Sequence, residues 1–250
     1  MPVHFEVSDG IGHIILDRPP VNALDRAHQQ ELARAARDAG KRKEVRAVVI
    51  HGAEGVFSAG ADIREMATLS PDEMKAHAPI LQDTFRTVAE IPKPVCAAIE
   101  GYALGGGFEL ALAADFRVCS GDAQIGLPEI HLGVIPGAGG TQRLTRLVGA
   151  AVATRLIMTG TRLEIDEAAR LGLVTVAPPG RALAAALDLL APLVDLSASA
   201  LAAAKRAIAA APSPDGFTRE TEEFAALFGT ANQKEGMGAF REKRKPNFRP

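Results

Sequence analysis

The chain has 250 residues, enough to bury a full hydrophobic core as one large domain or as a domain with an appendage. Its hydrophobic content of 47% and charged content of 23% are typical of a soluble globular protein. With 28 basic and 30 acidic residues the net charge is −2, which argues against a nucleic-acid or anionic-membrane surface across the whole molecule.

Cysteine usage and the amino terminus bear on the compartment. Cys96 and Cys119 lie in apolar strand-like runs without paired metal-ligand spacing, so we expect buried free thiols in a reducing compartment. The amino terminus passes directly into a strand pattern, with neither an apolar signal core nor an Arg/Ser-rich presequence. Charges, glycine or proline break every apolar run well short of about eighteen residues. We expect a cytoplasmic protein, although a processed organellar chain would look the same.

Strand and helix patterns alternate over the first two thirds of the chain. The predicted strands, recognised from apolar runs or alternation, are 4–7, 13–17, 46–51, 95–99, 116–120 and 124–126. The predicted helices, recognised from 3.6-residue spacing and from start and stop residues, run from 22 or 25 to 40 and over 70–89, 108–114, 138–149, 151–159 and 165–172. Asp9-Gly10 between the first two strands predicts a hairpin, and Pro71 suits a first helical position.

The last quarter of the chain has a different composition. From about Leu183 onward the pattern is wholly helical and rich in alanine and leucine, interrupted by Pro212-Ser213-Pro214. This shift predicts a subdomain boundary near residue 195. We therefore expect a catalytic core over residues 1–195 and a helical oligomerisation module over residues 196–250.

Three consecutive glycines, Gly105 to Gly107, separate the strand at 95–99 from the helix that follows. Glycine removes the side chain that would hinder a ligand near the backbone. The first N–H groups of a helix lack internal partners and lie at the positive end of its dipole, which favours an anionic oxygen. Glu109, in the first turn, adds a carboxylate beside that position. Alternatively, the glycines only allow tight strand–helix packing and Glu109 only complements the dipole.

Four segments, in the same order and spanning nearly the whole chain, resemble the enoyl-CoA hydratase (crotonase) family. They are V-F-S-A-G-A-D-I-R-E-M at 56–66, I-E-G-Y-A-L-G-G-G-F-E-L at 99–110, A-Q-I-G-L-P-E-I-H-L-G-V-I-P-G-A-G-G-T-Q-R at 123–143 and E-G-M-G-A-F-R-E-K-R-K-P-N-F at 235–248. The resemblance implies an α/β fold, a ClpP-like right-handed spiral of ββα units with a helical C-terminal module used for trimer formation. It also implies a lyase that adds water to trans-2-enoyl-CoA to give 3-hydroxyacyl-CoA, in fatty-acid β-oxidation or related acyl-CoA degradation.

Hydration of an unsaturated thioester places negative charge on the thioester oxygen. Backbone N–H donors aimed at that oxygen are usually the largest single catalytic contribution. The Gly106 N–H at the helix start is one such donor, and the resemblance assigns the Ala61 N–H as the other. The resemblance also matches Glu109 and Glu129 to the two glutamates of family hydratases. At the positive helix end Glu109 should ionise readily and act as the base, whereas Glu129, in apolar surroundings, should hold its proton and act as the acid.

The resemblance further implies a coenzyme A site. Ala23 and Leu24 would flank the pantetheine, backbone of Ala61, Asp62 and Ile63 would contact the adenine, Arg64 would lie at the rim, and Gly106 would contact the substrate. The tail cations, Arg241, Lys243, Arg244 and Lys245, either reach the phosphates, in the same or a neighbouring subunit, or remain solvated. We expect no separate cofactor and no metal, since coenzyme A is part of the substrate. The expected partner is a second copy of the chain, in a trimer or a dimer of trimers, with no nucleic acid and no membrane.

Other functions fit the sequence less well. A nucleotide-binding protein is disfavoured because Gly137 to Gln142 lacks the third glycine of the dinucleotide fingerprint and no G-x-x-x-x-G-K-[ST] occurs. A non-catalytic or RNA-binding family member would favour a basic surface and tolerate loss of the glutamates. Within the enzymes, the alternatives are a Δ3,Δ2-enoyl-CoA isomerase and a pathway-specific hydratase acting on a branched or aromatic acyl group.

Overall fold

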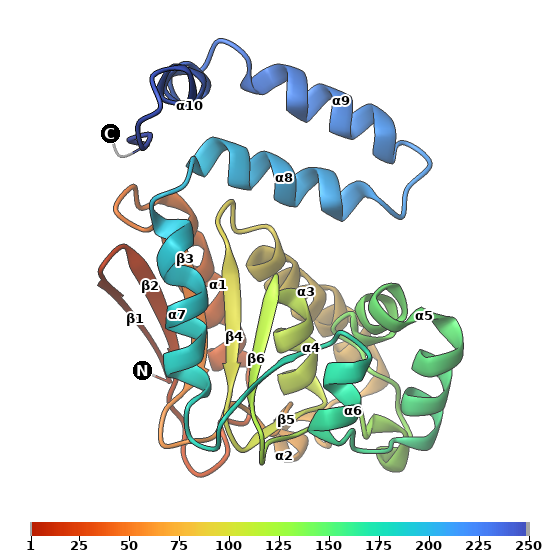
Figure 1. Cartoon of the computed structure of the whole chain (residues 1–250). Coiled ribbons are helices and arrows are strands. Elements are labelled where there is room, and N and C mark those ends of the chain that lie inside the picture. Colours follow the sequence, from red (N-terminus) through yellow and green to blue (C-terminus); the bar gives the residue numbers. More distant parts are fainter. Residues whose placement is uncertain (1, 249–250) are drawn as a thin grey trace.

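A six-stranded sheet in the order β1-β2-β3-β4-β6-β8 forms the centre of the computed structural model, which describes residues 2–248 (Figure 1). Its strands are β1 (Val3–Ser8), β2 (Ile11–Leu16), β3 (Ala47–Gly52), β4 (Val95–Ile99), β6 (Phe116–Ser120) and β8 (Thr175–Ala177). The pair β1–β2 is antiparallel and every other pair in the sheet is parallel. Parallel neighbours require crossover connections, which the helices supply.

The helices fall into those that surround the sheet and those that follow it. The first group is α1 (Arg26–Lys41), α2 (Ile63–Met66), α3 (Pro71–Ala89), α4 (Gly106–Ala113), the short 3₁₀ helix η1 (Glu129–Leu132), α5 (Gly140–Thr159), α6 (Ile165–Arg170) and α7 (Ala182–Val194). The second group is α8 (Ala198–Ala210), α9 (Gly216–Leu227) and α10 (Ala231–Arg241).

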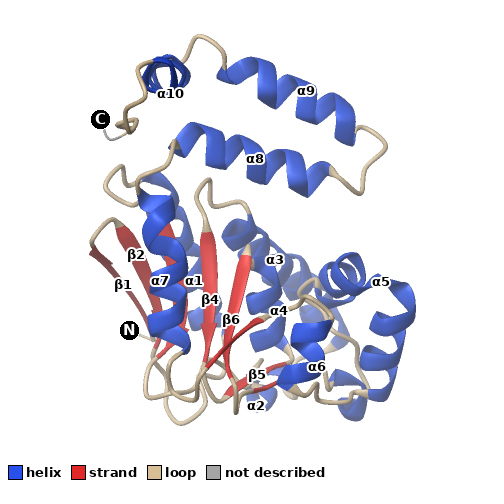
Figure 2. Ribbon diagram, viewed as in Figure 1, coloured by secondary structure: helices blue, strands red, loops and turns tan. Residues whose placement is uncertain are grey.

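Helices lie on both faces of the sheet (Figure 2), and a cluster of buried apolar side chains lies against each face. Because side chains alternate along a strand, Val48 and Ile50 of β3 join the core toward α1, α3 and α4. Ala47 and Val49, on the opposite face, pack with Leu190 of α7. With both faces covered, β3 and β4 are almost continuously apolar, as parallel strands are. The central strands of the sheet are therefore buried on both faces.

A second, two-stranded parallel sheet lies beside the start of α4. It pairs β5 (Tyr102–Leu104) with β7 (Gln124–Gly126). The loop before α2 runs along the other side of β5, where Ser58 forms a bridge with Ala103. The Ser58 N–H donates to the Tyr102 carbonyl over 2.8 Å, and the Leu104 N–H donates to the Ser58 carbonyl over 3.1 Å. This small sheet brings segments near residues 60, 105 and 126 into one place.

The structure confirms the expected α/β fold and most of its predicted elements. The hairpin at Asp9-Gly10 is present, Asp25 caps α1, and Ser70 with Glu73 forms a capping box ahead of Pro71. Cys96 and Cys119 are buried free thiols, and burial raises the pKa of each to about 12. The central helix was predicted to begin at 108 but begins at Gly106. Strands β5 and β8, of three residues each, were not predicted, although the equally short β7 (Gln124–Gly126) was.

Helices α8 to α10 form a separate layer above the sheet in Figure 1. The chain bends by 115° between α7 and α8. Lys205 of α8 ties this layer to the core, since its ammonium donates to Asp115 over 2.8 Å and to the Lys93 carbonyl over 3.2 Å. The boundary proposed at residue 195 stays a prediction. Within the described residues no single helix has the length and apolar character to cross a membrane, although α7 and α8 pass that test as a bent pair.

The close packing of α4 against the Ser58 loop gives a test of this architecture. A Cβ on Gly107 would lie 2.3 Å from the Ser58 carbonyl oxygen, so Gly107→Ala requires backbone movement and should cost about 1–3 kcal/mol or more of unfolding free energy. In Gly40→Ala, the matched control within α1, the new methyl would meet only Pro92 Cδ at 3.4 Å. Chemical denaturation of both variants measures the difference, and equal stabilities would contradict the tight approach.

Candidate active site

The start of α4 lies at the meeting point of three chain segments. Gly105 precedes the helix with a φ of +52°, which a side chain rarely tolerates, and no side chain caps the helix. As its first residue, Gly106 has no helical carbonyl for its N–H. The Gly105 N–H donates a hydrogen bond to the Gly126 carbonyl over 2.9 Å, so the first N–H here without a partner in the described part of the chain is that of Gly106.

The Ala61 peptide lies against this helix start. A Cβ built on Gly106 would be 3.4 Å from the Ala61 nitrogen, and one built on Gly60 would be 3.2 Å from the Gly106 nitrogen. Among the described residues, no turn, loop or cap hydrogen bond uses the N–H of Ala61 or Gly106. Two unpaired peptide donors from segments 45 positions apart in the sequence are thus brought together, the arrangement that binds an oxyanion.

Buried polar side chains fix the loop that carries Ala61. Ser58 is fully buried; its hydroxyl donates to the Asn22 carbonyl over 2.7 Å and accepts from the Gly60 N–H over 3.2 Å. The Asn22 amide donates to the Val56 carbonyl over 2.6 Å. Because buried polar groups that find partners hold one geometry, this network sets the orientation of the Ala61 peptide.

Glu109 projects from α4 toward the start of α5. Its Oε1 accepts the N–H of Ala138 over 2.8 Å and the N–H of Gly140 over 2.7 Å. The first turn of α5 contains no acidic residue of its own. The Glu109 carboxylate therefore occupies the position that favours an anion at the N-terminus of α5.

The expectation that Glu109 ionises readily is wrong in direction. Only 3% of the residue is exposed, and burial raises the pKa of Glu109, opposed by the Gly140 and Ala138 N–H groups and by Arg143. The helix dipole alone favours the carboxylate, but burial destabilises the carboxylate by more than the dipole stabilises it. A base with a raised pKa is the stronger proton acceptor, so this correction leaves the predicted role open.

Glu129, the first residue of η1, faces the same junction. Its Oε1 lies 3.2 Å from the position of a Cβ on Gly105. Both of its carboxyl oxygens are buried without a hydrogen-bond partner among the described residues. Burial, together with the charge of nearby Glu109, raises the pKa of Glu129 to about 7. The direction of this shift agrees with the expectation that apolar surroundings favour the protonated form of Glu129, and the two carboxyls have different surroundings.

The segments predicted to hold coenzyme A lie side by side. Leu24 and Ala61 form a parallel bridge, with the Leu24 N–H donating to the Gly60 carbonyl over 2.8 Å. Asp62 caps α2 and pairs with Arg18, whose Nη1 also donates to the Ala23 carbonyl. The next two residues, Ile63 and Arg64, are exposed.

The tail cations are elsewhere in the same chain. Arg244 pairs with Glu235 and Glu242 at 2.6 Å each, and Lys245 lies 3.8 Å from Asp195. Figure 1 places α10 at the opposite end of the molecule from α2 and β5. The tail of one chain therefore does not reach that chain's own site.

A family model described as enoyl-CoA hydratase/isomerase matches residues 6–250. The chain belongs to the enoyl-CoA hydratase/isomerase family. A probable enoyl-CoA hydratase of Rhizobium meliloti is 42% identical over 249 residues, covering 98% of this chain and 96% of the relative. A short-chain-enoyl-CoA hydratase of Clostridium acetobutylicum is 38% identical, covering 97% and 95%. An enoyl-CoA hydratase subunit of Geobacillus kaustophilus superimposes with a TM-score of 0.94 at 39% identity, covering 100% and 98%. The chain thus has the crotonase fold and is an enzyme of this family.

Several residues of this enoyl-CoA hydratase/isomerase family site were missed at the sequence level. The Ala138 and Gly140 N–H groups, which donate to Glu109, were assigned only to a helix start. Asn22 was predicted only as a possible cap of the first helix, a place that Asp25 takes, and Ser58 had no assigned role. The run P-G-A-G-G at 136–140 carried the signal for the first pair, because it exposes peptide donors just before a helix. Asn22 and Ser58 act through partners more than thirty residues away, which local pattern does not reveal.

The unpartnered carboxyl of Glu129 should lower stability as the pH rises. The raised pKa means that the folded chain keeps a proton that the unfolded chain loses, so stability falls between about pH 4.5 and pH 7. Glu129→Gln should remove this cost and be more stable than the parent at pH 8 by about 1–2 kcal/mol, after allowance for solvent screening.

Urea denaturation at pH 4.5 and pH 8, at one protein concentration, measures this effect. The gain should shrink at the lower pH, and Glu220→Gln, at an exposed position of α9, should show no such dependence. A Glu129→Gln variant less stable than the parent at pH 8 would indicate that the carboxylate has a stabilising partner.

Proposed function

We propose that this protein is an enoyl-CoA hydratase that converts a trans-2-enoyl-CoA to the 3-hydroxyacyl-CoA. The observation that carries the proposal is the pairing of two open peptide donors, at Ala61 and Gly106, with two differently held carboxyls, Glu109 and Glu129. The names of the relatives, hydratases at about 40% identity, support the same reaction.

In the proposed reaction the thioester oxygen accepts hydrogen bonds from the Ala61 and Gly106 N–H groups. Glu109 takes a proton from water as the water oxygen bonds to C3, and the electron pair of the double bond moves toward the thioester oxygen. Glu129 then delivers its proton to C2, which restores the thioester carbonyl. The raised pKa of each carboxyl suits its role, because Glu129 holds a transferable proton near neutral pH and Glu109 is a better base than a solvated carboxylate.

The roles of the remaining predicted residues follow from the same proposal. Ala23, Leu24 and the segment 61–64 flank the coenzyme A portion, and the tail cations of a neighbouring subunit contact its phosphates. No separate cofactor and no metal is assigned, because coenzyme A enters as part of the substrate. A role in fatty-acid β-oxidation and a cytoplasmic location stay predictions from the sequence. Both carboxyls are present, which favours hydration over Δ3,Δ2-isomerisation.

Loss of the 2-enoyl thioester absorbance, with crotonyl-CoA and longer homologues, tests the reaction. Glu109→Gln and Glu129→Gln should each lower kcat/KM by roughly 10²–10⁴-fold, because each removes one proton-transfer group. Circular dichroism should show that both variants keep the parent fold. Near-parental rates in either variant would show that its carboxyl is not the acid or base, and an inactive parent would refute the hydratase proposal.

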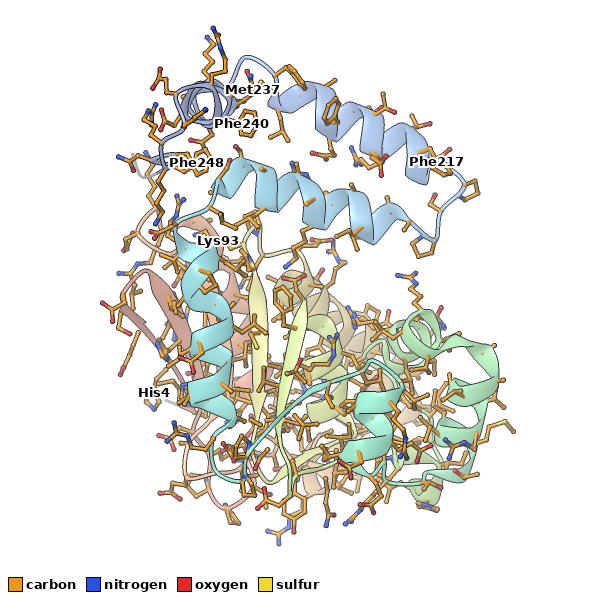
Figure 3. All side chains as sticks on the ribbon, in the orientation of Figure 1. His4, Lys93, Phe217, Met237, Phe240 and Phe248 are labelled. Atoms are coloured by element: carbon orange, nitrogen blue, oxygen red, sulfur yellow. The ribbon has the colours of Figure 1, made fainter. Side chains whose placement is uncertain are left out.

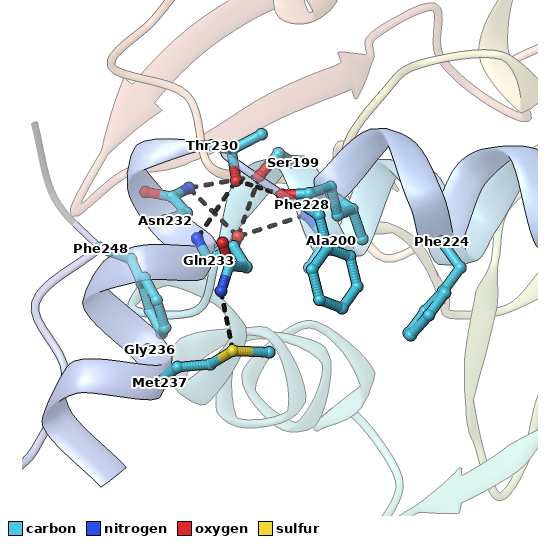
Figure 4. Close-up of a pocket in the computed structure, with 12 residues that line it drawn as sticks. Ser199, Ala200, Phe224, Phe228, Thr230, Asn232, Gln233, Gly236, Met237 and Phe248 are labelled. Atoms are coloured by element: carbon cyan, nitrogen blue, oxygen red, sulfur yellow. Dashed lines mark hydrogen bonds between the residues drawn. The ribbon is translucent and has the colours of Figure 1, made fainter. Parts of the chain in front are cut away.

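The proposal includes a homo-oligomer, a trimer or a dimer of trimers, formed through helices α8 to α10. These helices expose large apolar side chains: Ile208, Phe217, Phe224, Phe228, Met237 and Phe240. Phe217 and Phe240, 87% and 85% exposed, lie on the outer helices in Figure 3. A cavity of about 300 Å³ opens between the three helices, lined by Phe224, Phe228 and Met237 (Figure 4). Apolar surface of this extent on one layer is typical of a protein–protein interface.

Sedimentation velocity tests the assembly. The parent should sediment as a species of three or more chains, whereas Phe217→Asp and Phe240→Asp should shift it to smaller species because each places a charge in an apolar contact. Ser213→Asp, on the exposed α8–α9 turn, serves as the control. A monomeric parent, or variants that sediment like the parent, would contradict an interface at these residues.

A further inference from the structure

Arg143 is the fourth residue of α5 and lies beside the peptides that hold Glu109. Its Nη1 donates to the Ala138 carbonyl over 2.8 Å. The guanidinium also fills the space next to Gly139, where a Cβ would lie 2.2 Å from Nη1. Ala138 is thus held at both ends: its N–H donates to the Glu109 carboxylate, and its carbonyl accepts from Arg143.

The position of this cation is unfavourable for α5 itself. The start of a helix carries the positive end of the dipole, where a cation is destabilising. Arg143 is partly buried, and its like-charged neighbour Arg146 is only three residues away. Burial lowers the pKa of Arg143, whereas Glu109 raises it. Helix stability therefore does not explain a cation here, but the Glu109 carboxylate and the Ala138 carbonyl do.

We propose that Arg143 is a positioning residue that keeps Glu109 ionised and correctly oriented for proton transfer, by fixing the Ala138 peptide and by placing a positive charge near a buried carboxylate. The inference rests on the proposed function, in which Glu109 is the base.

The charged groups that face Glu109 come from two elements. Arg143 on α5 and the Ala138 and Gly140 N–H groups favour the carboxylate, whereas Glu129 on η1 has its own pKa raised by the charge of Glu109. Removal of Arg143 leaves the effect of burial on the Glu109 pKa with less opposition. The pKa of Glu109 should then rise, and activity should be lost at a higher pH on the acidic side.

The pH dependence of kcat/KM for Arg143→Met tests this inference. The acidic limb should move up by about one pH unit, which gives roughly a tenfold loss of rate below that limb. Arg146→Met, which removes an exposed cation from the same turn of α5, should leave the limb in place. Arg143→Lys, which keeps the charge without the planar fork, should give a smaller shift.

An infrared titration of the carboxyl bands in the free protein separates this inference from the proposed function. The Glu109 band, assigned by its loss in Glu109→Gln, should titrate at a higher pH in Arg143→Met whether or not the parent hydrates any enoyl-CoA. An unchanged titration, or an equal shift in Arg146→Met, would overturn the role of Arg143. If Arg143→Met does not fold, the pH profile and the infrared titration are measured on Arg143→Gln and Arg143→Lys instead. Results identical to those of the parent would overturn the role of Arg143.

Discussion

The contact between two backbone segments, the loop at Gly60 and the start of α4, is the constraint on which the rest of the site depends. A Cβ on Gly60 would lie 2.6 Å from the Leu104 carbonyl oxygen, and the Ser58 carbonyl excludes any side chain at Gly107. This approach brings together the unpaired N–H groups of Ala61 and Gly106, which come from distant segments. Because both donors are backbone groups, they need no side-chain rotamer to be fixed, and the cost of ordering them is met when the chain folds.

The same junction holds two carboxyls in opposite ways. Glu109 has lost its water but gained two N–H donors at the start of α5, whereas Glu129 has lost its water and gained no partner among the described residues. A buried carboxyl without a donor keeps its proton, and one with donors gives it up more easily. The difference between the two glutamates therefore arises from the backbone around them.

Local sequence pattern predicts much of the fold but only part of the site. The hairpin, the capped helices α1 and α3 and the apolar strands carry clear periodicity or cap residues, so their positions are readable. The glycine run before Glu109 is also a local signal, and it predicts an anion site because it leaves open N–H groups at the start of a helix. The hydrogen-bond donors to Glu109 lie about thirty positions away in the sequence, so local pattern did not predict them. The burial that raises its pKa depends on tertiary packing, so local pattern did not predict the direction of the pKa shift either. The resemblance to family motifs supplied Ala61 and Glu129, which spacing alone did not.

The ion pair between Lys205 and Asp115 makes the helical layer and the core interdependent. Asp115 follows α4, accepts the Val95 N–H over 2.8 Å and receives its ammonium partner from α8. A chain cut at the bend after α7 would lose the Lys205 ammonium, and with it the charge-assisted hydrogen bond to Asp115 and the bond to the Lys93 carbonyl that join the two parts. We expect a fragment of the first 195 residues to be less stable than the whole chain.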